Sequence, residues 1–215
     1  MSERGMIFNA EMVRALLDGR KTQTRRPIKW KQTRFTEIGE REDGSKWPWS
    51  EDAEHACDFW HPCPFGAVGD RIWVREAFRV HSRATDVATL VYKASERNSW
   101  TEQTRRVPVA VCNKPATPEK WTPSLHMPRW ASRILLEITD VRVERLNAIS
   151  HADAIAEGAP PSHPSIDCVS QEYGFPDFSR SWFGQTWQHI YGEESRDANP
   201  WVWVIEFKRI EGGAA

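Results

Sequence analysis

The 215-residue chain has little of several features that would assign its class directly. Its four cysteines are too few for the disulfide framework of a small secreted domain. No apolar run approaches the length of a membrane span, and the first residues lack the apolar core of a secretory signal. The formal net charge is −1, so a nucleic-acid partner would need a local basic patch. These absences predict a soluble, cytoplasmic protein with no membrane partner.

The chain also lacks the common nucleotide-binding and hydrolase motifs. It has no Gly-x-Gly-x-x-Gly fingerprint, no P-loop, no Gly-x-Ser-x-Gly elbow and no internal repeat. Many short segments of alternating hydrophobicity with a few helices between them predict an α+β fold or a small mixed barrel. Tryptophan is in excess, with 12 residues against 3 tyrosines. Indole rings can fill a core or stack on nucleic-acid bases.

A basic octet, residues 19–26, follows the first predicted helix. A short strand at residues 6–8 leads to Asn9, a good N-cap, and helical spacing of apolar residues continues to Leu17 before Gly19 ends the helix. Residues 19–34 contain seven Lys or Arg and no Asp or Glu. Such a run is often a solvated turn, but the absence of interleaved acids favours a surface that faces an anion.

One predicted strand, residues 66–80, carries an acid on its apolar face. Alternation places Glu76 on the side of Ile72, Val74, Phe78 and Val80, and Trp73 and Arg75 on the other side. A carboxylate among apolar residues requires a cation. Glu76 is therefore either half of a structural ion pair or a perturbed carboxylate suited to proton transfer, and the pattern does not choose between them.

Two regions have no period and are predicted to be insertions. Residues 31–64 are rich in Trp and read as an insertion or long ordered loop whose indoles pack as a lid, and residues 160–178 are loop-like. The first region holds zinc-type ligands in an H-x-C-x3-H-x-C arrangement, namely His55, Cys57, His61 and Cys63. The spacing matches no common zinc module and a second ligand pair is missing. We therefore predict no metal and no other cofactor, with these four as the weak candidates.

The rest of the chain gives clear local signals. Strands are predicted at residues 90–94, 107–112, 134–146 and 201–210, the third with a bend near Asp140. Ser150 and Asp153 form a capping box for a short helix, and a second helix ends at Gly192.

The basic octet resembles a known family signature. Gly19-x-Lys21-x-x-Thr24-x-Arg26 is similar to the G-x-K-x-x-T-x-R motif of the ASCH domain, and the strand around Glu76 is similar to the family's glutamate-bearing strand. The resemblance covers roughly two-thirds of the chain and is in the style of phage and prophage ASCH proteins. It implies one PUA-like domain over residues 1–215: a small mixed β-barrel with flanking short helices and insertions at about 31–64 and 160–178.

The resemblance also implies a chemistry. Some similar proteins are amidohydrolases that remove the acetyl group from N4-acetylcytidine with a lysine, a threonine and a glutamate, which here are Lys21, Thr24 and Glu76. Amide hydrolysis needs a nucleophile, a base that activates it and an acid for the leaving nitrogen. Thr24 offers the hydroxyl, and Arg26 or a backbone N–H offers the oxyanion donor. Whether Lys21 or Glu76 is the base stays open, because an ionised Glu76 beside Lys21 would raise the lysine pKa.

Two other functions remain as alternatives. A non-catalytic module would read a modified nucleoside or single-stranded RNA or DNA, with cations on phosphates and an exposed indole on a base. The residues that it would use are Arg20, Arg25, Arg26, Lys29, Trp73 and Arg75. A ribonuclease would want a metal, and the sequence shows no convincing carboxylate cluster for one. No oligomeric state is predicted.

Overall fold

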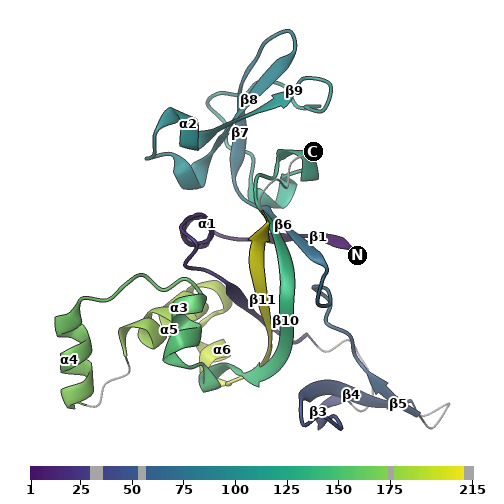
Figure 1. The fold of residues 1–215 in the computed structure, drawn as a ribbon, viewed down its shortest axis with the longest axis vertical. Helices are drawn as coiled ribbons and strands as arrows, with labels where there is room; N and C mark the ends of the chain where they lie inside the picture. The colour runs from purple at the N-terminus through teal and green to yellow at the C-terminus, as the bar shows by residue number, and fades with distance from the viewer. Residues whose placement is uncertain (30–35, 53–56, 174–176, 211–215) are drawn as a thin grey trace. The chain divides into compact units, whose positions relative to one another are not determined.

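The computed structural model describes residues 1–29, 36–52, 57–173 and 177–210, and these form an α+β fold (Figure 1). The strands are β1 (Glu3–Ile7), β2 (Gln23–Pro27), β3 (Thr36–Glu40), β4 (Lys46–Asp52), β5 (Cys57–Trp60), β6 (Arg71–Arg75), β7 (Phe78–Arg83), β8 (Val87–Tyr92), β9 (Thr104–Pro108), β10 (Leu135–Arg145) and β11 (Trp201–Ile210). The α-helices are α1 (Ala10–Leu17), α2 (Trp100–Gln103), α3 (His151–Ala156), α4 (Pro164–Tyr173), α5 (Phe178–Tyr191) and α6 (Glu193–Asp197). Short 3-10 turns are η1 (Lys93–Ser95), η2 (Ser124–His126), η3 (Arg129–Ala131) and η4 (Leu146–Ala148).

The described strands lie in three sheets. One has the order β1-β6-β10-β11-β2, and the others are β3-β4-β5 and β7-β8-β9. The β1–β6 pair is parallel, whereas β10 with β6 and β11 with β2 are antiparallel. Within the described ranges no pairing closes a sheet into a barrel. None of the helices in those ranges combines the length and hydropathy that a membrane span requires.

The chain divides into two compact units, which are described separately. Unit 1 consists of Met1–Gly19, Gly69–Glu137 and Lys208–Ala215, and unit 2 consists of Arg20–Val68 and Ile138–Phe207. Each unit has a core cluster of its own. The single domain predicted over residues 1–215 stays a prediction.

The core of unit 1 lies under the β7-β8-β9 sheet. Its largest members are Phe78, Leu90, Tyr92 and Met127, all at most 2 % exposed. The predicted helix cap is confirmed, because the Asn9 side chain accepts a hydrogen bond from the Met12 amide at 2.8 Å at the start of α1. Gly19 follows this helix with φ +76°, a left-handed conformation that favours glycine.

The strand predicted at residues 66–80 is in fact two strands in different sheets. β6 ends at Arg75 and β7 begins at Phe78. The alternation nevertheless runs on without a break, since the even residues from Ile72 to Val80 are buried and the odd residues are partly exposed. Sequence reasoning found the correct faces but missed the change of sheet, because the period of two does not reveal which partner a strand pairs with.

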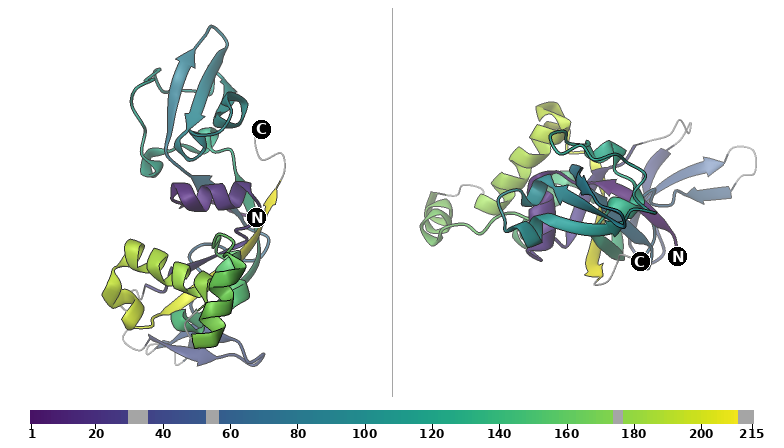
Figure 2. Two further views of the ribbon diagram at one scale, coloured as in Figure 1. Left: turned by 90° about the vertical axis from the view of Figure 1, so that its left-hand side faces the viewer. Right: turned by 90° about the horizontal axis from the view of Figure 1, so that it is seen from above.

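Unit 2 is organised around β11 and α5. The predicted strand at residues 201–210 is confirmed, with Val202, Val204 and Ile205 fully buried. The predicted second helix is α5, which begins at an Asp177 cap and ends at Gly192 with φ +89°. Its buried Phe183 and Trp187 pack in the same cluster as Val204. Helix α5 packs beside α3, as labelled in Figure 1; Figure 2 shows the same ribbon from two further sides.

The Trp-rich region is a sheet and not the long loop that the sequence predicted. Strands β3, β4 and β5 pair in antiparallel order. An added Cβ at Gly39 would lie 3.0 Å from the Trp60 ring, so this glycine admits a close indole. Trp47 packs edge-on against Trp203 with 5.0 Å between ring centroids. The prediction of loop at 160–178 is also wrong in part, because Pro164–Tyr173 forms α4.

Candidate functional site

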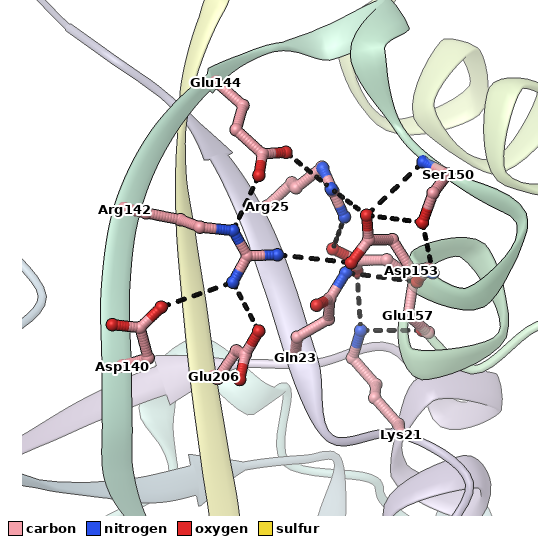
Figure 3. A network of polar contacts seen from close by, with 10 residues as sticks. All are labelled: Lys21, Gln23, Arg25, Asp140, Arg142, Glu144, Ser150, Asp153, Glu157 and Glu206. Carbon is pink, nitrogen blue, oxygen red and sulfur yellow. Dashed lines mark hydrogen bonds and ion pairs between the residues drawn. The ribbon is translucent and has the colours of Figure 1, made fainter. Parts of the chain in front are cut away.

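Lys21 lies buried at the C-terminal end of α3 (Figure 3). Its Nζ donates to the backbone carbonyl of Glu157 at 2.7 Å and to Glu157 Oε2 at 2.9 Å. The neighbouring residues reach the same place, since Thr22 N donates to the Ala156 carbonyl and Arg20 Nη1 to the Gly158 carbonyl. The carbonyls that end a helix carry partial negative charge. The first residues of the octet therefore cap α3.

Arg25, one of the cations expected to contact nucleic-acid phosphates, is buried. It is 3 % exposed and reaches three carboxylates: Glu144 Oε2 at 2.9 Å, Glu157 Oε1 at 3.3 Å and Asp153 Oδ2 at 3.4 Å. Its guanidinium also lies 5.8 Å from the Phe183 ring centroid. The octet contains no acid, but β10 and α3 supply acids more than a hundred residues later. Lys21 and Arg25 are thus paired with distant carboxylates and lie buried.

A second arginine extends this network across β10 and β11. Arg142 contacts Glu144 at 2.6 Å, Asp153 at 3.2 Å and Glu206, as drawn in Figure 3. Burial lowers the pKa of Arg142, but the hydrogen bonds that it donates to Glu144 and Glu206, together with their negative charges, outweigh burial and raise the pKa. The network contains three cations and five carboxylates, namely Lys21, Arg25, Arg142, Asp140, Glu144, Asp153, Glu157 and Glu206.

Burial lowers the pKa of the Lys21 ammonium below its usual range. The charge and hydrogen bond of Glu157 act in the opposite direction, while the charges of Arg26 and Arg25 lower it further. Thr24 is on β2, 2 % exposed, and pairs with Ile205 of β11. The octet thus runs from a turn at Gly19 into β2, and Lys21 and Thr24 are both buried within unit 2.

Glu76 belongs to unit 1, at the two-residue break between β6 and β7. It is 2 % exposed, and Arg133 binds it with both nitrogen arms, Nε to Oε1 at 2.8 Å and Nη2 to Oε2 at 3.0 Å. Arg133 also lies over the Tyr92 ring at 4.1 Å and donates to Ser95 Oγ. Burial raises the pKa of the Glu76 carboxyl, and the Arg133 pair lowers it by less. The expected buried carboxylate is confirmed, and Arg133 is a partner that sequence reasoning missed.

The remaining candidates have varied surroundings. Arg26 is half-buried and donates to the Tyr191 hydroxyl at 3.3 Å, while Lys29 is exposed. Arg75 Nε donates to the Ser124 carbonyl, and its guanidinium lies 5.4 Å from the Trp73 ring centroid. Within the sites named from sequence, Trp73, Arg75 and Glu76 thus lie in unit 1. The others, Arg20, Lys21, Thr24, Arg25, Arg26 and Lys29, lie in unit 2.

The weak metal candidates are only partly described. His55 and the Cys57 side chain lie outside the described residues. His61 Nε2 lies 2.8 Å from Ser50 Oγ, and burial lowers the pKa of the His61 imidazole. Cys63 is buried and is in no disulfide. Among the residues whose placement is described, no three His, Cys, Asp or Glu side chains gather as a metal site would require.

Comparison with known proteins adds no relative. No family model matches the chain, and no curated protein or solved structure matches it either. A function for this chain must therefore be inferred from the chemistry of its own residues. The chief candidates are the buried Lys21, which precedes β2, and the buried Glu76 of unit 1.

Proposed function

We propose that the protein is an amidohydrolase that removes an acyl group from a modified cytidine of the N4-acetylcytidine type. The ASCH-like signature suggests the reaction and, with it, a PUA-like barrel. The observation that carries the proposal is the Lys21 amine, which is buried within hydrogen-bonding distance of Glu157 and has a lowered pKa. A lysine with a lowered pKa is suited to accept a proton.

A general base at Lys21 would be the uncharged amine, because only that form carries a lone pair. Burial favours this form because it penalises the ammonium charge.

The proposed reaction has two steps. In the first, Thr24 Oγ1 adds to the acyl carbonyl carbon, and its proton passes to the Lys21 amine. The tetrahedral intermediate then breaks its C–N bond, and the leaving N4 nitrogen takes a proton, so that free cytidine and an acyl-threonine form. In the second step water adds to the ester and releases the carboxylic acid and Thr24.

We assign the proton donor for the leaving nitrogen to Glu76. The raised pKa of its buried carboxyl supports this role, because the protonated form persists to higher pH than in an exposed glutamate. The resemblance supports it as well. The assignment makes Lys21 the base and Glu76 the acid.

The test incubates the protein with N4-acetylcytidine and measures the release of cytidine by chromatography. We expect turnover by the wild-type protein and a loss of about 10²–10⁴-fold in Lys21→Ala, Thr24→Ala and Glu76→Gln, as for removal of an acid, base or nucleophile. Thr24→Ser keeps the hydroxyl and should retain more activity than Thr24→Ala. Matched controls are Lys46→Ala, Thr22→Ala and Glu119→Gln, which change exposed residues of the same types.

Two results would reject the proposal. One is a wild-type protein that is inert on a panel of N4-acylated cytidines. The other is turnover that Lys21→Ala leaves unchanged. If the inert protein instead bound RNA with an affinity that falls steeply with salt, the binding module would replace the amidohydrolase. The burial of Arg25 weakens the binding-module alternative, because a buried guanidinium is not exposed to a nucleic-acid phosphate.

A further inference from the structure

Unit 2 contains a pocket that the proposed reaction does not use. Its volume is about 290 Å³, near the lower end of the range for small-ligand sites. The apolar part of its lining includes Leu146, Phe183 and Trp187, and the charged part is Arg180, Arg196 and Asp197. Helices α5 and α6, which follow each other in the chain, contribute most of these residues (Figure 1).

Arg196 is held in this pocket by a close approach to α5. An added Cβ at Gly184 would lie 2.7 Å from both terminal nitrogens of Arg196, so only glycine leaves room for the guanidinium. One position earlier, Ser195 Oγ accepts a hydrogen bond from Trp187 Nε1 at 3.1 Å, which fastens α6 to α5. A glycine inside a helix weakens it relative to alanine. Helix α5 thus contains a helix-destabilising glycine at the point where it contacts the Arg196 guanidinium.

The charge of Arg196 has no recorded counter-ion among the described residues. It is half-buried, and no side-chain hydrogen bond or ion pair of Arg196 is found in the ranges that the structure describes. Arg180 is exposed and interacts electrostatically with Asp177, which caps α5. A guanidinium offers five donors in a planar fork that matches the oxygens of a phosphate or carboxylate.

We infer that this pocket binds the phosphate group of a small phosphate monoester. The pocket lining carries two guanidiniums and the single carboxylate of Asp197, so its net charge is positive and favours an anion. A phosphate monoester carries nearly two negative charges at neutral pH, and its oxygens match the planar fork of a guanidinium. Arg196 would hold the phosphate oxygens, Arg180 would add charge at the exposed side, and the Phe183 and Trp187 rings would contact the rest of the ligand. The inference is independent of the proposed hydrolysis, because neither arginine belongs to the Lys21 network and binding requires no turnover.

Calorimetric titration of the full chain with CMP, cytidine and inorganic phosphate tests the inference. CMP and cytidine differ only in the phosphate, so we expect CMP to bind about tenfold or more tightly, with a difference that shrinks as salt is added. Equal affinity of CMP and cytidine would overturn the inference. If inorganic phosphate binds more weakly than CMP, the aromatic rings contribute to binding. If the two bind with equal affinity, the pocket recognises the phosphate group alone.

Two variants locate the binding. Arg196→Gln should weaken CMP binding about tenfold or more, whereas Lys46→Gln removes one exposed charge of the same unit and should leave it unchanged. Gly184→Ala should displace the flexible end of Arg196 and weaken binding while the melting temperature stays the same or rises, because alanine favours the helix. Unchanged CMP affinity in folded Arg196→Gln and Gly184→Ala proteins would overturn the inference.

Discussion

At the scale of single residues, the notable feature of unit 2 is a carboxylate shared by two buried basic side chains. Glu157 meets Lys21 with one oxygen and Arg25 with the other. Burying charge is costly unless each charge is paired and hydrogen-bonded, and losing one partner of a buried pair typically costs about 3–5 kcal/mol. Glu157 therefore contacts both buried basic side chains of the octet, and it raises the Lys21 pKa against the larger effect of burial.

The ionisation of Glu76 gives a prediction on stability. Because its pKa is raised by burial above the ordinary value of 4.5, the folded chain keeps a proton on Glu76 where the unfolded chain has released it. Stability from this group is complete below about pH 4.5 and is lost as the pH rises through the folded pKa. The free energy of unfolding of the wild type, relative to Glu76→Gln, should therefore fall from pH 4.5 upward in urea titrations.

The control for this experiment is Glu119→Gln, an exposed glutamate of the same unit, which corrects for the general loss of a negative charge. If the free energy of unfolding of the wild type, relative to Glu76→Gln, instead rises with pH, the Arg133 pair outweighs burial. That result would remove the support for Glu76 as an acid at neutral pH.

At the scale of elements, the short helix α3 organises the ion network. Asp153 and the C-cap residue Glu157 are four positions apart and so lie on the same side of the helix. The Ser150 hydroxyl accepts from the Asp153 amide at 3.1 Å and donates to Asp153 Oδ2 at 2.8 Å. The capping box therefore fixes the carboxylate that also reaches Arg25 and Arg142.

Removing this cap should have a measurable cost. Ser150→Ala should lower the free energy of unfolding by about 1 kcal/mol, because two hydrogen bonds at the helix start are lost. For a chain of this size the melting temperature should fall by about 2–4 °C. Ser99→Ala removes the similar capping box of the four-residue α2. The Glu102 side chain of that box has no ion pair within the described residues, so the loss in free energy of unfolding should be smaller than for Ser150→Ala. Equal costs would contradict the link between the α3 cap and the network.

Elements with strong local signals were predictable and the others were not. The caps Asn9, Ser150 and Gly192 were found because capping depends on neighbours in the chain. Strand β2 was missed because its residues are mostly polar, and the pattern contains no apolar alternation. Strands β3–β5 were missed because Pro48 and scattered acids conceal the aromatic alternation, although a proline is tolerated in some strand positions.

At the scale of the whole molecule, the two core clusters described above each come from one continuous segment. The cluster of unit 1 lies within residues 78–131 and that of unit 2 within residues 146–204. Long-range contacts instead form the pairings of the five-stranded sheet and the ion pairs. Sequence reasoning predicted that Glu76 would be buried, yet Arg133 lies 57 positions away and Glu157 lies 136 positions from Lys21. No local pattern contains that information.

The two clusters predict localised responses to core mutations. Leu90→Ala creates a cavity in the first cluster, where Leu90 is fully buried, and should cost about 2–5 kcal/mol. In native-state hydrogen exchange, the largest loss of protection should fall within residues 78–131. Val204→Ala should instead cause the largest loss of hydrogen-exchange protection within residues 146–204. Equal losses over both segments in each variant would show that the chain opens as one cooperative unit.

The unbroken alternation of residues 71–80 constrains how this chain can change length. Each buried residue from Ile72 to Val80 alternates with an outward one, and three of the outward residues are arginines, namely Arg71, Arg75 and Arg79. Adding or deleting one residue here would turn guanidiniums inward and apolar side chains outward on one side of the change. Single substitutions preserve the register, so this stretch can drift in composition while its length stays fixed, and Glu76 keeps its inward place only while that length is kept.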